Sequence, residues 1–322
     1  MKAVAIGIFS SSSPISATVP VRYERGKQYL TSKGFTIIDG KLYGKRDFYR
    51  SGSIFERADE VNSLLHNDEI DILMASVGGC VTNSILPYID YDYLKNHPKI
   101  IIGYSDVTAL LLAVYAKTGI PTYYGPALAA SFGEFPPLVN MTCRYFSDIV
   151  LGGKALPYRY EMPPVWTEER IDWASQDRAK TTRKNEWICV REGSCKGRLI
   201  GGNLNTMSGI FGTEYMPEIK EGDILFIEDS LKNAFIVERS FSLLKLAGVL
   251  DKVGGIILGK HEGFDDCGTG RAPHEILLEV LGDRDIPVLA QFDCCHTHPM
   301  FTLPIGKTFE LDATRKSVVL VG

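Results

Sequence analysis

Residues 100–116 read Ile-Ile-Ile-Gly-Tyr-Ser-Asp-Val-Thr-Ala-Leu-Leu-Leu-Ala-Val-Tyr-Ala, and this stretch decides the fold. The run from Ile100 to Ile102 is short, β-branched and without alternation, which predicts a strand buried on both faces of a parallel sheet. Apolar residues between 107 and 115 then recur at helical spacing, and Gly119 supplies an end to the helix. The sequence therefore predicts a strand and a helix joined by a bend at residues 103–106.

Ser105 in this bend has two interpretations. A serine there would raise its hydroxyl at the carboxyl edge of the sheet, where the helix N-terminus offers free N–H groups to a developing oxyanion. Serine is also favoured as a simple helix N-cap, which is a far commoner role than catalysis. The bend lacks the second glycine of G-x-S-x-G, which excludes an α/β-hydrolase elbow. Taken alone, the stretch leaves nucleophile and cap open.

Composition is that of an ordinary globular protein of 322 residues, with 45% hydrophobic and 23% charged residues. The net charge is −4 and there is no basic tract, so neither nucleic acid nor a membrane is expected as a partner. The apolar run at the N-terminus is too short and too rich in β-branched residues for a signal peptide. We therefore expect a cytoplasmic protein. Seven cysteines without C-x-x-C spacing indicate reduced thiols.

The order of elements divides the chain into three parts. Strands and helices alternate up to about residue 150, which predicts an N-terminal α/β domain, residues 1–153, with a doubly wound, Rossmann- or flavodoxin-like parallel sheet. Residues 154–190 carry three tryptophans and no regular period, and we expect a long connecting loop. Residues 191–322 are expected to form a smaller C-terminal α/β domain with a barrel-like sheet.

Two further loops of the first domain follow predicted strands. Residues 10–14, Ser-Ser-Ser-Ser-Pro, come after the strand at 4–9, and Val77-Gly78-Gly79 comes after the strand at 70–74. Glycines let a backbone approach a ligand closely, and their N–H groups could form half of an oxyanion hole. The same residues could simply turn the chain. In a doubly wound sheet both glycine-containing bends would share one crevice.

The second domain adds an acid and a base at strand ends. Glu228 closes a predicted strand, and His296 and His298 follow the strand at 287–291. A hydroxyl nucleophile needs a base, and the base needs a third group to fix its tautomer. Spacing alone does not prove that these residues meet. No metal or cofactor is expected, because the acidic residues around His261 lack a second suitably spaced histidine.

Several segments resemble the LD-carboxypeptidase family of serine peptidases, and they span nearly the whole chain in the right order. They are Val77-Gly78-Gly79, Leu86-Pro87-Tyr88-Ile89-Asp90-Tyr91-Asp92, Pro98-Lys99, Gly103-Tyr104-Ser105-Asp106, Gly201-Gly202-Asn203-Leu204, Ile227-Glu228-Asp229 and the run from His296 to Gly306. The Trp-bearing insertion, the Leu-Pro-Tyr-Ile-Asp-Tyr element and Asn83, where murein-trimming members tend to have Arg, look more like the microcin C self-immunity branch.

The resemblance implies a Ser-His-Glu triad made of Ser105, His296 and Glu228, in a protein that is usually a homodimer. It also implies an oxyanion hole formed by the main-chain N–H groups of Gly79 and Asp106.

His296 is preferred to His298 because the family's histidine directly precedes the Thr-x-Pro-Met element. The chain departs from the family pattern at Cys80, Cys295 and His298, where an aromatic residue, Gly and Asp are usual. A cysteine nucleophile at Cys80 or Cys295 is disfavoured.

Members of this branch hydrolyse the amide joining a terminal aminoacyl group to a nucleotide, as in microcin C and aminoacyl-sulfamoyl adenylates. A flat base needs an aromatic partner, for which Trp173 is the first candidate and Trp166 the second, although both could merely pin the loop. Asn205, Lys232 and Glu262 are carried over as contacts to ribose, phosphate and substrate amine. A murein tetrapeptide LD-carboxypeptidase and a non-catalytic binding module are the alternative functions.

Overall fold

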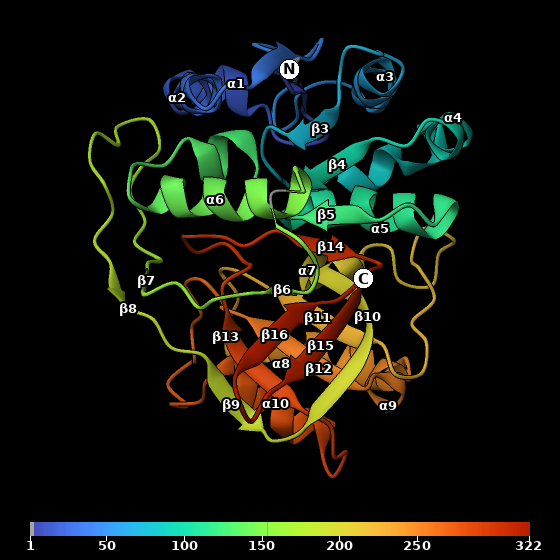
Figure 1. Ribbon diagram of the computed structural model, residues 1–322, viewed down its shortest axis with the longest axis vertical. Coiled ribbons are helices and arrows are strands. Elements are labelled where there is room, and N and C mark those ends of the chain that lie inside the picture. Colours follow the sequence, from blue (N-terminus) through green and yellow to red (C-terminus); the bar gives the residue numbers. More distant parts are fainter. Residues whose placement is uncertain (1–2, 153) are drawn as a thin grey trace.

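A six-stranded sheet organises the first half of the molecule. The computed structural model describes residues 3–152 and 154–322, and in it the strands run in the order β14-β5-β4-β3-β1-β2. Five strands are parallel, whereas β14 comes from the far end of the sequence and pairs antiparallel with β5 (Figure 1). The strands are β1 (Ala5–Phe9), β2 (Thr36–Asp39), β3 (Ile72–Ala75), β4 (Ile100–Gly103), β5 (Thr122–Tyr124) and β14 (Leu303–Ile305).

Helices cover both faces of this sheet. They are required on both sides because the strands are apolar throughout, without alternation with polar residues. Successive side chains of a strand point to opposite faces, so Ile8 packs in the core cluster under α2 and α6, while Phe9 packs in the cluster under α3 and α5. The helices are α1 (Ile15–Thr18), α2 (Pro20–Ser32), α3 (Ile54–Leu65), α4 (Tyr91–Asn96), α5 (Thr108–Thr118) and α6 (Leu138–Val150), with 3₁₀ turns at Thr82–Tyr88 and Ser105–Val107 and a π turn at Leu128–Phe132. The predicted doubly wound sheet is confirmed.

The second sheet has eight strands in the order β6-β16-β15-β10-β11-β12-β13-β9. Strands β10 to β13 are parallel, and the outer strands pair antiparallel. They are β6 (Tyr158–Arg159), β9 (Ile188–Arg191), β10 (Ser194–Asn203), β11 (Ile224–Glu228), β12 (Gly255–Gly259), β13 (Val288–Phe292), β15 (Thr308–Asp312) and β16 (Ser317–Leu320). Within the described residues β6 does not pair with β9, so hydrogen bonds do not close the sheet, and its barrel-like character stays a prediction.

Four helices accompany the second sheet: α7 (Leu204–Ser208), α8 (Ala234–Leu246), α9 (Val249–Lys252) and α10 (Pro273–Leu281). A two-stranded hairpin, β7 (Val165–Trp166) with β8 (Arg183–Lys184), stands apart in the connecting segment (Figure 1). Strands β6 and β9 of that segment belong to the second sheet, and β14 belongs to the first, so strand pairing crosses the predicted domain limits. Among the described residues no helix is both long and apolar enough to cross a bilayer.

Candidate active site

Ser105 occupies a tight bend between β4 and α5. Its φ of 61° lies in the left-handed region, which costs a non-glycine residue on the order of 1–3 kcal/mol. The neighbouring loop presses against it, because a Cβ placed on Gly78 would lie 2.8 Å from the Cβ of Ser105. The N-cap positions of the following helices are Tyr104 and Val107, neither with a side-chain cap. The Ser105 hydroxyl therefore does not cap the helix.

That hydroxyl instead meets His296. Ser105 Oγ lies 2.9 Å from His296 Nε2, and His296 Nδ1 lies 2.8 Å from Glu228 Oε2. Glu228 is fully buried at the end of β11, and its Oε1 accepts hydrogen bonds from the Tyr124 hydroxyl at 2.6 Å and from Asn203 Nδ2 at 2.9 Å. The three residue types predicted at strand ends thus form one continuous hydrogen-bonded series.

The charges of this series stabilise each other. Burial alone would raise the pKa of Glu228, but the adjacent His296 and the hydrogen bonds from His296, Tyr124 and Asn203 hold it below its ordinary value. Burial likewise opposes protonation of His296, yet the Glu228 carboxylate raises the pKa of that imidazole above its usual range. The arrangement can therefore accept a proton at His296 and stabilise the imidazolium that results.

The Gly79 loop is fixed beside the nucleophile bend. Gly79 has a φ of 151°, and a Cβ there would lie 2.2 Å from Ser12 Oγ, so glycine is required. Ser12 Oγ accepts a hydrogen bond from the Cys80 N–H, and the Asp106 carboxylate accepts bonds from the N–H and hydroxyl of Thr82. The Asp106 side chain thus ties the Gly79 loop to the nucleophile bend.

A cleft of about 460 Å³ opens over Ser105 and His296. It lies between the first sheet, the connecting segment and the loops of the second domain. Trp173 and Glu262, two of the predicted substrate contacts, line it, and burial raises the pKa of Glu262. The lining residues are Ser13, Val77, Gly78, Gly79, Tyr104, Ser105, Arg170, Ile171, Asp172, Trp173, Lys180, Ser230, Leu231, Glu262, His296 and His298.

The other three predicted substrate contacts do not line this cleft. Trp166 borders a separate cavity, where its ring is packed against the Arg183 guanidinium at 4.0 Å and the Lys260 ammonium at 5.0 Å. Asn205 is exposed on α7, and the Lys232 ammonium lies 3.5 Å from an Asp229 carboxylate oxygen in the β11–α8 loop. Trp166 thus lies on the hairpin, outside the cleft over Ser105.

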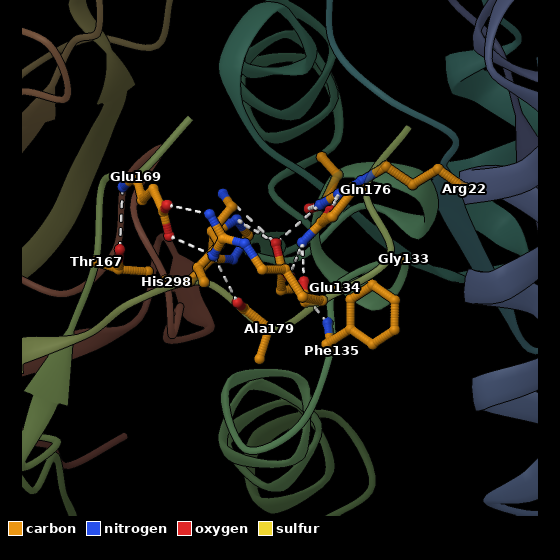
Figure 2. A network of polar contacts seen from close by, with 12 residues as sticks. Arg22, Gly133, Glu134, Phe135, Thr167, Glu169, Gln176, Ala179 and His298 are labelled. Carbon is orange, nitrogen blue, oxygen red and sulfur yellow. Dashed lines mark hydrogen bonds and ion pairs between the residues drawn. The ribbon is translucent and has the colours of Figure 1, made fainter. Parts of the chain in front are cut away.

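His298 belongs to a second polar group that the sequence did not reveal. We call Arg22, Glu134, Gln176, Lys180 and His298 the Glu134 cluster, of which Figure 2 labels all members except Lys180. The Glu134 carboxylate accepts bonds from Arg22 Nη2 at 3.1 Å and Gln176 Nε2 at 2.6 Å, and His298 Nε2 lies 3.9 Å away. These contacts join α2, the connecting segment and the histidine loop.

Some of these residues carried a faint sequence signal and some carried none. Asn203 lies in the Gly-Gly-Asn-Leu motif and Tyr124 ends a strand of the first sheet, so both could have been assigned to the carboxyl edge. Glu134 follows a π turn that separates it from the end of β5, and nothing in its neighbourhood pointed to the site. Burial raises the pKa of the Cys295 thiol to about 12 and keeps it protonated, so this cysteine is a poor nucleophile.

Models of known families match both halves of the chain. The LD-carboxypeptidase N-terminal domain matches residues 6–125, and the LD-carboxypeptidase C-terminal domain matches residues 196–311. The chain belongs to the LD-carboxypeptidase family.

Within the LD-carboxypeptidase family the chain falls in the MccF-like branch. The microcin C7 self-immunity protein MccF of Escherichia coli is 52% identical over 315 residues, which cover 97% of this chain and 92% of that protein. A solved structure of MccF without ligand matches with a TM-score of 0.97 and 52% identity, over 99% of this chain and 96% of that one. A structure of MccF in complex with aspartyl sulfamoyl adenosine matches with the same TM-score at 51% identity, over 100% of this chain and 97% of that one. This chain is accordingly a carboxypeptidase-type hydrolase.

Proposed function

We propose that the protein is a serine hydrolase that cleaves the amide between a terminal aminoacyl group and a nucleotide, as in microcin C and aminoacyl-sulfamoyl adenylates. The observation that carries the proposal is the hydrogen-bonded series of Ser105, His296 and Glu228 at the floor of a cleft walled by Trp173. The likeness to MccF, which is known in complex with aspartyl sulfamoyl adenosine, supports the substrate class.

The chemistry follows from the geometry of the series. Ser105 Oγ attacks the amide carbonyl while His296 Nε2 takes its proton, and Glu228 holds the imidazole through Nδ1 and stabilises its positive charge. The carbonyl oxygen becomes an oxyanion that the N–H groups of Gly79 and Asp106 stabilise. His296 then gives the proton to the leaving nitrogen, and water attacks the acyl-enzyme with His296 again as the base.

Substrate contacts come from the walls of the cleft. The ring of Trp173 stacks on the nucleobase, at about 1–3 kcal/mol for a base-sized ring, and the Glu262 carboxylate receives the α-amine of the aminoacyl group. Asn205 and Lys232 reach the ribose and phosphate only with a rearrangement of the α7 and β11–α8 loops, because neither borders the cleft. We further propose a cytoplasmic homodimer, in line with the family resemblance, and sedimentation of the purified protein tests the dimer.

The nucleophile assignment is tested by Ser105→Ala. Turnover of aspartyl-sulfamoyl adenosine falls by roughly four orders of magnitude or more, because the acyl-enzyme cannot form, while the circular dichroism spectrum is unchanged. Ser208→Ala is the matched control, since Ser208 is an exposed serine outside the cleft. Near-normal turnover by Ser105→Ala refutes the mechanism.

A paired substrate assay tests the substrate class. The purified protein is given aspartyl-sulfamoyl adenosine and murein tetrapeptide in parallel, and the proposal expects the higher kcat/KM on the nucleoside substrate. A preference for the tetrapeptide, with release of the terminal D-residue, makes the protein a cell-wall-recycling LD-carboxypeptidase instead. Failure of a serine-directed phosphonate to label the protein indicates a binding module.

A further inference from the structure

Two buried charges on α3 contact loops of the active site and not each other. Arg57 and Glu60 lie one turn apart on this helix, and each is only 1% exposed. Within the described part of the chain neither side chain forms an ion pair, and their partners are main-chain atoms and one serine hydroxyl. Burial of an unpaired charge is costly. The hydrogen bonds that these two groups make to the loops must therefore offset that cost.

The Arg57 guanidinium binds two loops at once. Its Nη1 donates to Ser11 O at 2.6 Å and to Val81 O at 3.1 Å. Ser11 lies in residues 10–14, which we call the serine loop, and Val81 lies in the Gly79 loop. A guanidinium presents its N–H donors in a rigid planar fork. The spacing between the two loops is therefore set by one side chain.

The serine loop in turn contacts the peptide that carries the proposed oxyanion-hole donor. Ser12 Oγ accepts a hydrogen bond from the Cys80 N–H at 2.9 Å. The Ser13 N–H donates to Gly78 O at 3.2 Å. Gly79 lies between these two contacts in the sequence, so a displacement of the serine loop moves the Gly79 N–H with it.

Glu60 fixes the start of the same loop. Its Oε2 accepts a hydrogen bond from the Ser10 N–H at 2.6 Å, and its Oε1 accepts one from the Leu42 N–H at 2.7 Å. A carboxylate accepts at both oxygens, whereas an amide side chain would present donors to one of these N–H groups. The serine loop is thus held at Ser10 by Glu60 and at Ser11 by Arg57.

We propose that Arg57 and Glu60 are positioning residues of the oxyanion hole, which hold the Gly79 N–H at the place where the oxyanion forms. The inference deepens the proposed function and rests on it, because Ser105 must be the nucleophile. Loss of one oxyanion-hole donor lowers kcat by about 10²- to 10³-fold, so a displaced donor has a smaller effect of the same kind. Binding of the uncleaved substrate does not depend on this donor.

Arg57→Lys tests the proposal, because it keeps the charge and removes the planar fork. We expect kcat to fall by about 10- to 100-fold on whichever substrate the wild type cleaves, with KM changed by less than about threefold. Labelling by the serine-directed phosphonate, whose adduct places an oxygen in the oxyanion hole, slows by a similar factor. Arg46→Lys, at an exposed arginine outside the cleft, is the matched control. A variant with wild-type kcat, or one whose loss lies in KM alone, overturns the proposal.

Hydrogen exchange supplies a readout that does not depend on activity. The Cys80 and Val81 N–H groups both bind Ser12 Oγ. We expect these two amides to exchange at least about tenfold faster in Arg57→Lys, while the amides of α5 keep their wild-type rates. Glu60→Gln speeds exchange at the same two amides, and it replaces Arg57→Lys if that variant does not fold.

Unchanged exchange in these variants overturns the proposal. A wild-type protein that the phosphonate does not label contradicts the proposed function instead. In that case the exchange rates still test whether Arg57 and Glu60 hold the two loops together.

Discussion

Two buried carboxylates in this molecule each lie near a histidine, and the pKa values of the two imidazoles are shifted in opposite directions. Glu228 lies 2.8 Å from His296 and raises the pKa of its imidazole. Glu134 lies 3.9 Å from His298, whose pKa is lowered to about 3. The two histidines are only two residues apart in the sequence, yet one is prepared to carry a proton and the other is not.

The difference lies in the other hydrogen-bond and ion-pair partners of each carboxylate. Glu228 accepts its other hydrogen bonds from neutral groups, the Tyr124 hydroxyl and the Asn203 amide, so its charge remains available to an imidazolium. Burial is the first cause of the lowered pKa of His298, and the charges of Lys180 and Arg22, which share the Glu134 carboxylate, lower it further. A nearby carboxylate therefore raises the pKa of a histidine only if its charge is not already shared with other cations.

Replacing each histidine in turn tests this comparison with the largest effect. His296→Ala lowers kcat by roughly four orders of magnitude or more, because the general base is lost. His298→Ala keeps at least about a tenth of wild-type kcat, since a neutral imidazole outside the series takes no proton. Single-turnover assays of both variants check this, and equal losses would remove the distinction.

Replacing each carboxylate comes next. Glu228→Gln lowers kcat/KM on the order of 10³- to 10⁴-fold, because the amide no longer fixes the tautomer of His296. Its pH profile shifts as well. The wild-type acid limb reports loss of the proton from His296, whose pKa Glu228 raises, so the limb moves to lower pH in the variant. An unmoved limb argues against the pairing.

Glu134→Gln acts on stability instead of chemistry. Removing the carboxylate leaves the buried Arg22 and Lys180 without a counter-charge, and we expect the free energy of unfolding to fall by about 3–5 kcal/mol. Burial alone would raise the pKa of Glu134, but the charges of Lys180 and Arg22 and the Phe135 N–H hold it below its ordinary 4.5, so its contribution is complete above pH 4.5 and is lost as the pH falls through that lowered pKa. Denaturant unfolding at pH 7 and pH 3 checks both statements, and a variant as stable as wild type contradicts them.

The tryptophans give the smallest and most selective effect. Trp173→Ala lowers kcat/KM on nucleoside substrates by about 10- to 100-fold, as expected for the loss of one stacked base. Trp166→Ala alters the separate cavity. It leaves the ratio of kcat/KM on nucleoside substrates to kcat/KM on a plain peptide unchanged. If Trp173→Ala lowers kcat/KM on a plain peptide by the same factor, the ring only holds the loop in place. The Arg22 guanidinium lies 4.6 Å from the centre of the Trp173 ring.

The parts of the site that lie at strand ends could be predicted from the sequence, because parallel strands bring their carboxyl ends to one edge. Ser105, Glu228 and His296 were found in this way together with the family motifs. Contacts between distant loops could not be predicted. The choice between Trp173 and Trp166 depends on the path of residues 154–190, which have no regular period. The place of Glu134 in the site depends in turn on how residues 154–190 pack against α2.

The same limit applies to the fold. Residues 303–305 lie within the predicted second domain, and only tertiary packing sends β14 back to pair with β5. Local pattern fixes a strand and its faces, but not which sheet edge it joins.

The return of β14 has a consequence for synthesis of the protein. During translation the first five strands emerge early, but the edge of β5 stays open until β14 has left the ribosome. A truncated polypeptide would carry that uncovered edge, a template for pairing with other chains, and it would also lack His296. Because β14 follows His296 closely in the sequence, hydrolytic competence and protection of the edge arise together during synthesis.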